Sequence, residues 1–293
     1  MVPLLLGAAA IWGISNVADA ESNVNAANRI NKEAAELAND ANQRLTNAHG
    51  QMMQTIDKLG NTKRIISKEI GNVGDLIEKI TKRIKRENNT RALRELEENG
   101  IYENMLNQLA MFSNKAEQYQ KEAQMELDAS ENENAVCVFG ALGAAAFGFG
   151  MVAMPAMLLY SFMKSDEAEA AYYNAKTKLD EAKVYAERCN NMNALFSAMN
   201  NRGKQIDNLL KKLNTYFRPS TDALNTVYRN YGDDYKIYSP ESKMTVFYSF
   251  QLAQTIKTIV ETSMFQEDGS FNTDMDKTLD KGEQTLRFLT SNS

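Results

Sequence analysis

The chain has 293 residues, a formal net charge of -5, one histidine, two cysteines and four prolines. This mild charge gives no electrostatic footprint for nucleic acid, and two cysteines are too few for a disulfide framework. Because proline is scarce and Ala, Glu, Lys, Asn, Gln and Met are abundant, the composition favours long helices and predicts an all-α protein.

The first element is an apolar run at residues 2–14, within an N-terminal segment of residues 1–20. It is short for a transmembrane helix and typical of the apolar region of a signal peptide. Ala18-Asp19-Ala20 would serve as a cleavage site, but no Lys or Arg precedes the run. Three interpretations stay open: a cleaved signal, a retained terminus that enters or lies on a membrane, and a terminus packed in the core.

A long helical stalk is expected at residues 21–134. Apolar residues recur in an eleven-residue pattern at residues 34–56 and in a heptad pattern at residues 59–84, where Lys63 is the one charged residue at a seam position. A narrow stripe of this kind is typical of a coiled coil and needs a partner helix.

Gly60, Gly71 and Gly74 lie in this helix, and we interpret them as small residues at a close helix crossing rather than as breaks. The interruption is expected at residues 87–89 or 99–100. A further helical stretch then follows, with one face formed by Leu106, Leu109, Phe112, Ala116, Tyr119, Ala123 and Leu127.

A second long helix is predicted at residues 164–218, closed by Arg218-Pro219. Both long helices have Ala-rich and then bulky seams, so we expect them to pair as an elongated antiparallel coiled coil or helical bundle. The residues expected to mediate helix pairing or oligomer formation are Leu45, Ile56, Ile66, Ile70, Ile77, Leu179, Phe196 and Leu210. Residues 219–293 are richer in aromatics and are expected to form a compact end of three shorter helices, one of which starts at Ser239-Pro240.

The segment at residues 135–163 carries no charged side chain. As one straight helix it would measure roughly 43 Å, against a hydrocarbon core of about 30 Å. It can cross a membrane with a kink at Pro155, or form a hairpin that bends near residues 148–155. A single span separates the two long helices, whereas a hairpin leaves them on one side, where they can pair. We therefore favour a hairpin or a sequestered apolar tongue over a permanent span.

Small residues form two rows in this segment, one at Gly140, Ala144 and Gly148 and one at Ala146 and Gly150. Such spacing lets helices cross closely in lipid. An apolar hairpin buried inside a soluble bundle is the other interpretation. The residues expected to insert into a membrane are Gly140, Gly143, Ala144, Phe147, Gly148, Gly150, Pro155 and Leu158.

The sequence contains no motif for catalysis. His49, the only histidine, is expected on a helix surface, and no phosphate-binding glycine loop is present. The acidic turns at residues 233–234 and 267–269 lack the spacing of calcium ligands. We therefore expect no enzyme, cofactor, metal, nucleic acid or small-molecule substrate. The basic stretch at residues 79–94 is interpreted as a solvated helix end, with contact to anionic lipid headgroups as the alternative.

The order of these parts resembles an uncharacterised bacterial family, with an apolar start, an Ala/Asn-rich helix from Ala26-Ala27-Asn28 onward and a Gly/Ala-rich middle. The tail segments at residues 231–235 and 267–269 also look like that family's tail. The layout is similar to the α-helical pore-forming proteins of the cytolysin A and Bacillus tripartite enterotoxin type, although no residue motif is shared. Those proteins hide an apolar tongue between long helices and insert it on assembly.

These observations lead to one expected function and one alternative. We expect a membrane-associated protein that inserts residues 135–163 and oligomerises, and that forms pores or perturbs membranes in a bacterial cell. The alternative is a membrane-anchored coiled-coil scaffold or sensor without pore activity. The expected partners are a lipid bilayer and further copies of the chain or another helical protein. The expected location is the inner membrane or a passage from cytoplasm to membrane, rather than secretion.

Overall fold

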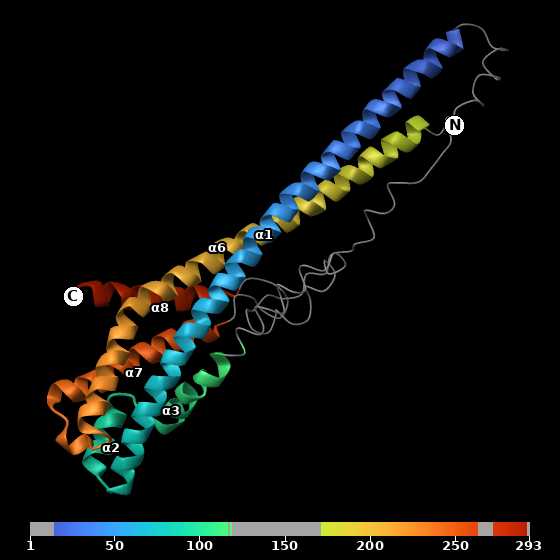
Figure 1. Ribbon diagram of the computed structural model, residues 1–293. Helices are drawn as coiled ribbons and strands as arrows, with labels where there is room; N and C mark the ends of the chain where they lie inside the picture. The colour runs from blue at the N-terminus through green and yellow to red at the C-terminus, as the bar shows by residue number, and fades with distance from the viewer. Residues whose placement is uncertain (1–14, 117, 119–170, 263–271, 292–293) are drawn as a thin grey trace. The chain divides into compact units, whose positions relative to one another are not determined.

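This computed structural model describes residues 15–116, 118, 171–262 and 272–291 (Figure 1). All regular secondary structure in these residues is helical, which confirms the predicted all-α class. The helices are α1 (Ser15–Arg86), α2 (Thr90–Glu98), α3 (Glu103–Ala110), α6 (Ala171–Tyr231), the short 3₁₀ helix η4 (Tyr235–Ile237), α7 (Pro240–Glu261) and α8 (Thr273–Ser291).

The chain divides into two compact units, each of which uses part of α1 and part of α6. Of the described residues, the first unit holds 15–52 and 171–199, and the second holds 53–118 and 200–291. Both long helices were expected from the apolar periodicity, and both exist.

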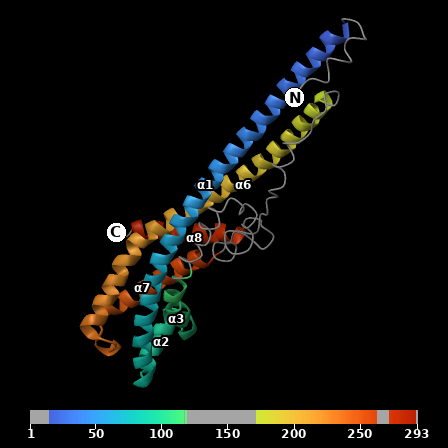
Figure 2. The ribbon, with the colours of Figure 1, turned by 45° about the vertical axis from the view of Figure 1, so that its right-hand side comes forward.

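The two long helices run in the same direction in the first unit. The Tyr185 hydroxyl donates to Asn42 Oδ1 at 3.4 Å, and further along the rings of His49 and Phe196 lie 5.4 Å apart. Residue numbers therefore rise together along both helices. Figures 1 and 2 both show the start of α1, in blue, beside the start of α6, in yellow-green.

The same direction holds in the second unit. The contact pairs there are Thr55 with Asn200, Thr62 with Asp207 and Arg83 with Asp233. The prediction that these two helices pair antiparallel is therefore wrong. The two long helices are not consecutive in the chain, because the α3 segment lies between them and already runs back along α1.

Antiparallel packing does occur, but between other neighbours in the second unit. Gly71 of α1 faces Ser113 and Gly74 faces Ala110, so the α3 segment runs opposite to α1. The α6–α7 pair and the α7–α8 pair are hairpins of the same kind, with Ser220 bonded to Ser249 and Ile259 lying against Gly282. The predicted antiparallel helical bundle is thus confirmed in this coarser form.

The interruption was predicted at residues 87–89 or 99–100, and the helices break at both places. α1 ends at Arg86, and Asn88 takes a positive φ of 50° in the turn. Asn89 then caps α2, because its Oδ1 accepts a hydrogen bond from the backbone N–H of Ala92 at 3.2 Å. α2 ends before Gly100, which has a φ of 79° that glycine adopts without steric cost.

The predicted end of the second long helix at Arg218-Pro219 is wrong. α6 continues through Pro219 to Tyr231, so the last 75 or so residues do not start with a separate helix. Pro219 removes one backbone hydrogen bond, but tertiary contacts beyond it hold the helix in place. Ser220 is bonded to Ser249 of α7 at 2.6 Å, and Leu224 is fully buried.

The predicted start of α7 is confirmed. Ser239 lies just before Pro240, and its hydroxyl accepts from the backbone N–H of Ser242 at 3.2 Å. This is the N-cap arrangement with proline in the first turn. α7 then buries the side chains Val246, Phe247, Phe250, Leu252, Ala253, Ile256, Ile259 and Val260.

Candidate functional site

The residues expected to insert into a membrane lie outside the described part of the chain. They are Gly140, Gly143, Ala144, Phe147, Gly148, Gly150, Pro155 and Leu158. Their membrane role stays a prediction.

The residues expected to mediate pairing lie in the seams of the two units. Seven of them have exposures of 8 % or less, and Leu179 is half-buried. Leu45 and Phe196 are in the first unit, and the other five buried ones are Ile56, Ile66, Ile70, Ile77 and Leu210 in the second. Because their own chain already covers these side chains, a second copy would have to bind on another surface.

The seam of the second unit also contains hydrogen-bonded polar pairs. Thr55 Oγ1 donates to Asn200 Oδ1, and one heptad later Thr62 Oγ1 donates to Asp207 Oδ1, both at 2.6 Å. All four residues are buried. Because a register shift would leave buried polar groups without these partners, the pairs fix how α6 lies along α1.

Lys63, the charged residue predicted at a seam position, is buried with 3 % of its surface exposed. Its Nζ donates to the carbonyl oxygen of Val260 at 3.0 Å, near the end of α7. A cation is stabilised there because the last carbonyls of a helix lack partners within the helix and carry partial negative charge. The charge in the seam therefore anchors α7 to α1.

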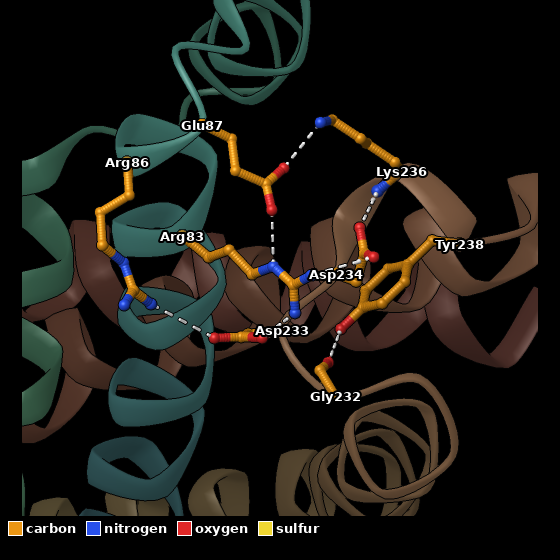
Figure 3. Close-up of polar contacts among 8 residues, drawn as sticks. All are labelled: Arg83, Arg86, Glu87, Gly232, Asp233, Asp234, Lys236 and Tyr238. Carbon is orange, nitrogen blue, oxygen red and sulfur yellow. Dashed lines mark hydrogen bonds and ion pairs between the residues drawn. The ribbon is translucent and has the colours of Figure 1, made fainter.

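A cluster of charged residues joins the end of α1 to the loop after α6 (Figure 3). Arg83 is at its centre. Its Nη1 donates to Asp233 Oδ1 at 2.6 Å, its Nη2 to Asp234 Oδ2 at 3.0 Å, and its Nε to Glu87 Oε1 at 2.8 Å. Lys236 Nζ pairs with the other oxygen of Glu87 at 2.8 Å. All three nitrogens of the guanidinium are thus engaged in the fork geometry that makes arginine pairs specific.

The acidic loop owes its position to Gly232. This residue ends α6 with a φ of 63°, and its backbone N–H donates to the Tyr228 carbonyl at 2.7 Å. The Tyr238 hydroxyl donates back to the Gly232 carbonyl at 2.6 Å. The loop therefore presents Asp233 and Asp234 to α1 in a fixed conformation.

The charged partners shift the pKa values in the cluster. Hydrogen bonds from Lys236 and Arg83 lower the pKa of Glu87 to about 2, and the hydrogen bond to Asp233 raises the pKa of Arg83. Burial raises the pKa of the Tyr238 hydroxyl. At neutral pH the cluster is therefore held in its ion-paired form.

The ion pairs of this cluster bear on the two interpretations of the basic stretch at residues 79–94. Arg83, Lys82 and Lys85 are paired with carboxylates, and Arg86 Nη2 lies 3.6 Å from Asp233 Oδ2. A large part of the positive charge is thus neutralised within the chain, which supports the helix-end interpretation over a lipid contact. Sequence reasoning treated the basic stretch and the Asp233-Asp234 turn separately. No pattern in the sequence links them, because Arg83 and Asp233 are 150 positions apart.

His49 is half-buried. The prediction from the sequence, a position on the helix surface, is therefore wrong. The His49 ring packs against Phe196, and burial lowers its pKa from the ordinary value. Cys189 is free and buried in the same unit. Burial also raises the pKa of the nearby Tyr185 to about 12.

No family model matches the sequence, no curated protein matches it, and no solved structure matches its fold. Among the helices that the structure describes, none is both long and apolar enough to span a bilayer. Within residues 15–116, 118, 171–262 and 272–291, no three His, Cys, Asp or Glu side chains come together as a metal site would require.

Proposed function

We propose that this protein acts on membranes by inserting residues 135–163 into the bilayer, with residues 2–14 as a second membrane-binding stretch. The observation that carries the proposal is the absence of any charged side chain from residues 135–163 in a chain whose remaining helices are strongly polar. A long uncharged segment gains free energy on leaving water, at about 25 cal/mol per Å² of apolar surface buried.

The direction of the long helices supports this proposal. In the first unit α1 and α6 run the same way, so their first residues lie toward one end of that unit. Residues 2–14 directly precede α1, and residues 135–163 precede α6 by a short polar stretch. Both apolar stretches are therefore joined to the helix pair at the same end, where they can meet one membrane surface.

The consequence of insertion that we propose is pore formation or membrane perturbation within a bacterial cell, with several copies acting together. The layout resembles that of the cytolysin A and tripartite enterotoxin type, in which an apolar tongue lies between long helices. A location at the inner membrane, reached from the cytoplasm, follows from this proposal. No catalytic step, cofactor, nucleic acid or small-molecule substrate is part of it.

The second candidate is a membrane-anchored scaffold or sensor. The continuous helices favour it, because α1 has 72 residues and α6 has 61, and long paired helices can relay partner binding. Membrane fractionation of the untagged protein followed by an alkaline carbonate wash separates the two candidates. Permanent integral behaviour would exclude the soluble-to-inserted change, and complete solubility would exclude the anchored scaffold.

Vesicle flotation with a leakage assay tests the proposed insertion. The variant Ala144→Lys places a charge in the apolar segment, and a charge at the centre of a bilayer costs several kcal/mol, so flotation and leakage should both fall. Gly50→Lys is the matched control, because Gly50 of α1 is exposed and has open space around it. If Ala144→Lys behaves like Gly50→Lys, residues 135–163 do not insert.

A further inference from the structure

The outer face of α7 is an uncharged strip within the second unit. Five of its residues recur at steps of three and four from Thr245, and Met244 lies one turn before Tyr248. All six are exposed or half-exposed: Met244, Thr245, Tyr248, Gln251, Thr255 and Thr258. The two nearby lysines point elsewhere, since Lys243 pairs with Glu95 of α2 and Lys257 pairs with Glu261. Depletion of charge and the presence of Tyr and Met distinguish the centres of protein interfaces from other surfaces.

Hollows flank this strip on both sides. On the α6 side a hollow of about 710 Å³ is lined by Tyr216, Pro219, Ala223, Met244 and Tyr248, among others. On the α8 side a hollow of about 640 Å³ includes Met105, Tyr248 and Phe288. Met244, in the hollow on the α6 side, and Phe288, in the hollow on the α8 side, are large apolar residues that are 63 % and 66 % exposed.

The charges at the two ends of the strip are opposite. Glu241 lies on the same face at the start of α7, and Lys281 of α8 lies beside Thr258 at the other end. The two ends are about 25 Å apart along the helix, at about 1.5 Å per residue, so these charges do not meet within one chain. A second copy, turned about a two-fold axis between Tyr248 and Gln251, would place each Glu241 beside the other copy's Lys281.

From this self-complementary pattern we infer that the α7 face binds a second copy of this chain in an antiparallel, two-fold pair. A specific interface of standard size buries roughly 800 Å² on each partner, whereas this one rests on a single helix face and its margins. The pair is therefore a weak dimer that forms as concentration rises. This inference names the surface through which copies associate and does not require membrane insertion.

Sedimentation of the full-length protein over a concentration series, without lipid, tests the pairing. Glu241→Lys and Lys281→Glu each place like charges together twice across the two-fold axis, so each should weaken the dimer by about tenfold. The double variant restores opposite charges and should regain most of the affinity. A protein that stays monomeric throughout the series, or a double variant no better than the single ones, would overturn the inference.

A second pair of variants controls for surface charge in general. Met244→Glu places a charge within the face, whereas Val184→Glu changes an apolar residue of the first unit that is 50 % exposed. Both positions are at the surface, so both variants should fold. Only Met244→Glu should abolish the dimer, and an equal effect of the two variants would contradict the α7 surface. Because lipid is absent from these experiments, neither result bears on the proposed membrane insertion, which the vesicle assays test separately.

Discussion

At the scale of single residues, two glycines of α1 determine how closely α3 can approach. A Cβ on Gly71 would lie 2.7 Å from the backbone nitrogen of Ser113, and one on Gly74 would lie 2.8 Å from the backbone carbon of Leu109. Backbone atoms cannot move aside as a flexible side chain can. The two glycines are therefore required by packing, as their interpretation as small residues at a crossing predicted.

Replacing these glycines should destabilise the second unit. Gly71→Ala and Gly74→Ala force the α3 segment away from α1, and overpacking of this kind typically costs about 1–3 kcal/mol in the free energy of unfolding. Gly50→Ala is the control, because its new methyl group meets open space and alanine is the better helix former by about 1 kcal/mol. Denaturant unfolding should show opposite signs for the two kinds of variant. A gain in stability at Gly71 and Gly74 would contradict the close crossing.

His49 gives the chain a pH dependence that can be assigned to one residue. Burial against Phe196 lowers its pKa below the ordinary value, so near and below pH 6.5 the unfolded chain binds more protons than the folded one. Stability must then rise with pH through this window and fall on acidification.

Thermal unfolding of the parent protein and of His49→Gln at pH 7.5 and pH 5.5 measures this effect. Because the chain has no other histidine, the parent should lose more stability on acidification than the variant does. An identical loss in both proteins would show that His49 does not titrate differently in the folded state.

The Arg83 cluster could not have been predicted from the sequence. Arg83 and Asp233 are 150 positions apart, and each is an ordinary charged residue near a helix end. Nothing in a single sequence pairs two such positions. The same holds for the contact of Lys63 with Val260, although the seam position of Lys63 was evident from the heptad pattern.

At the scale of helices, the seam itself could be read from the sequence, but its direction could not. An apolar stripe of period 3.5 to 3.7 shows which residues face a partner helix, and the buried residues of α1 follow it from Ala34 to Ile84. The stripe looks alike for a parallel and an antiparallel partner. The direction depends on the elements between the two helices in the chain, and the α3 segment among them runs back along α1.

The continuation of α6 through Pro219 has a similar cause. Local preference predicts an end at Arg218, because proline lacks the N–H that the helix needs. Packing of Ser220 and Leu224 in the second unit outweighs that preference. Tertiary contacts thus override a local signal that is usually reliable.

An engineered disulfide tests the register of the long helices. A Cβ on Gly203 of α6 would lie 4.0 Å from the Cβ of Thr55 of α1, within the range that a disulfide spans. Thr55→Cys with Gly203→Cys, in a chain whose Cys137 and Cys189 are replaced by serine and alanine, should therefore form an intramolecular bond on mild oxidation.

The control pairs Gly203→Cys with Gly50→Cys, whose added side chain has no neighbour within 4 Å. Mass mapping should find the bond in the first protein alone. Failure of Thr55→Cys and Gly203→Cys to join, with the protein folded, would contradict this register.

At the scale of the whole molecule, the buried seams, the charged contacts and the exposed α7 face have different roles. The seams are filled by the chain's own residues, the Arg83 cluster and Lys63 hold the second unit together, and the α7 face is the surface left for a second copy. The uncharged residues 135–163 supply the proposed contact with lipid. The sequence alone predicted that segment, because the absence of charge needs no tertiary information.

The most direct test of the membrane proposal follows a fluorophore attached at Ala144→Cys, with Cys137 and Cys189 replaced as above. When lipid vesicles are added, the account predicts a blue shift of the emission and quenching by nitroxide groups held near the bilayer centre. The same fluorophore at Gly50→Cys should remain accessible to an aqueous quencher. A label at residue 144 that keeps its aqueous emission and is quenched only from the water phase would contradict the insertion of residues 135–163.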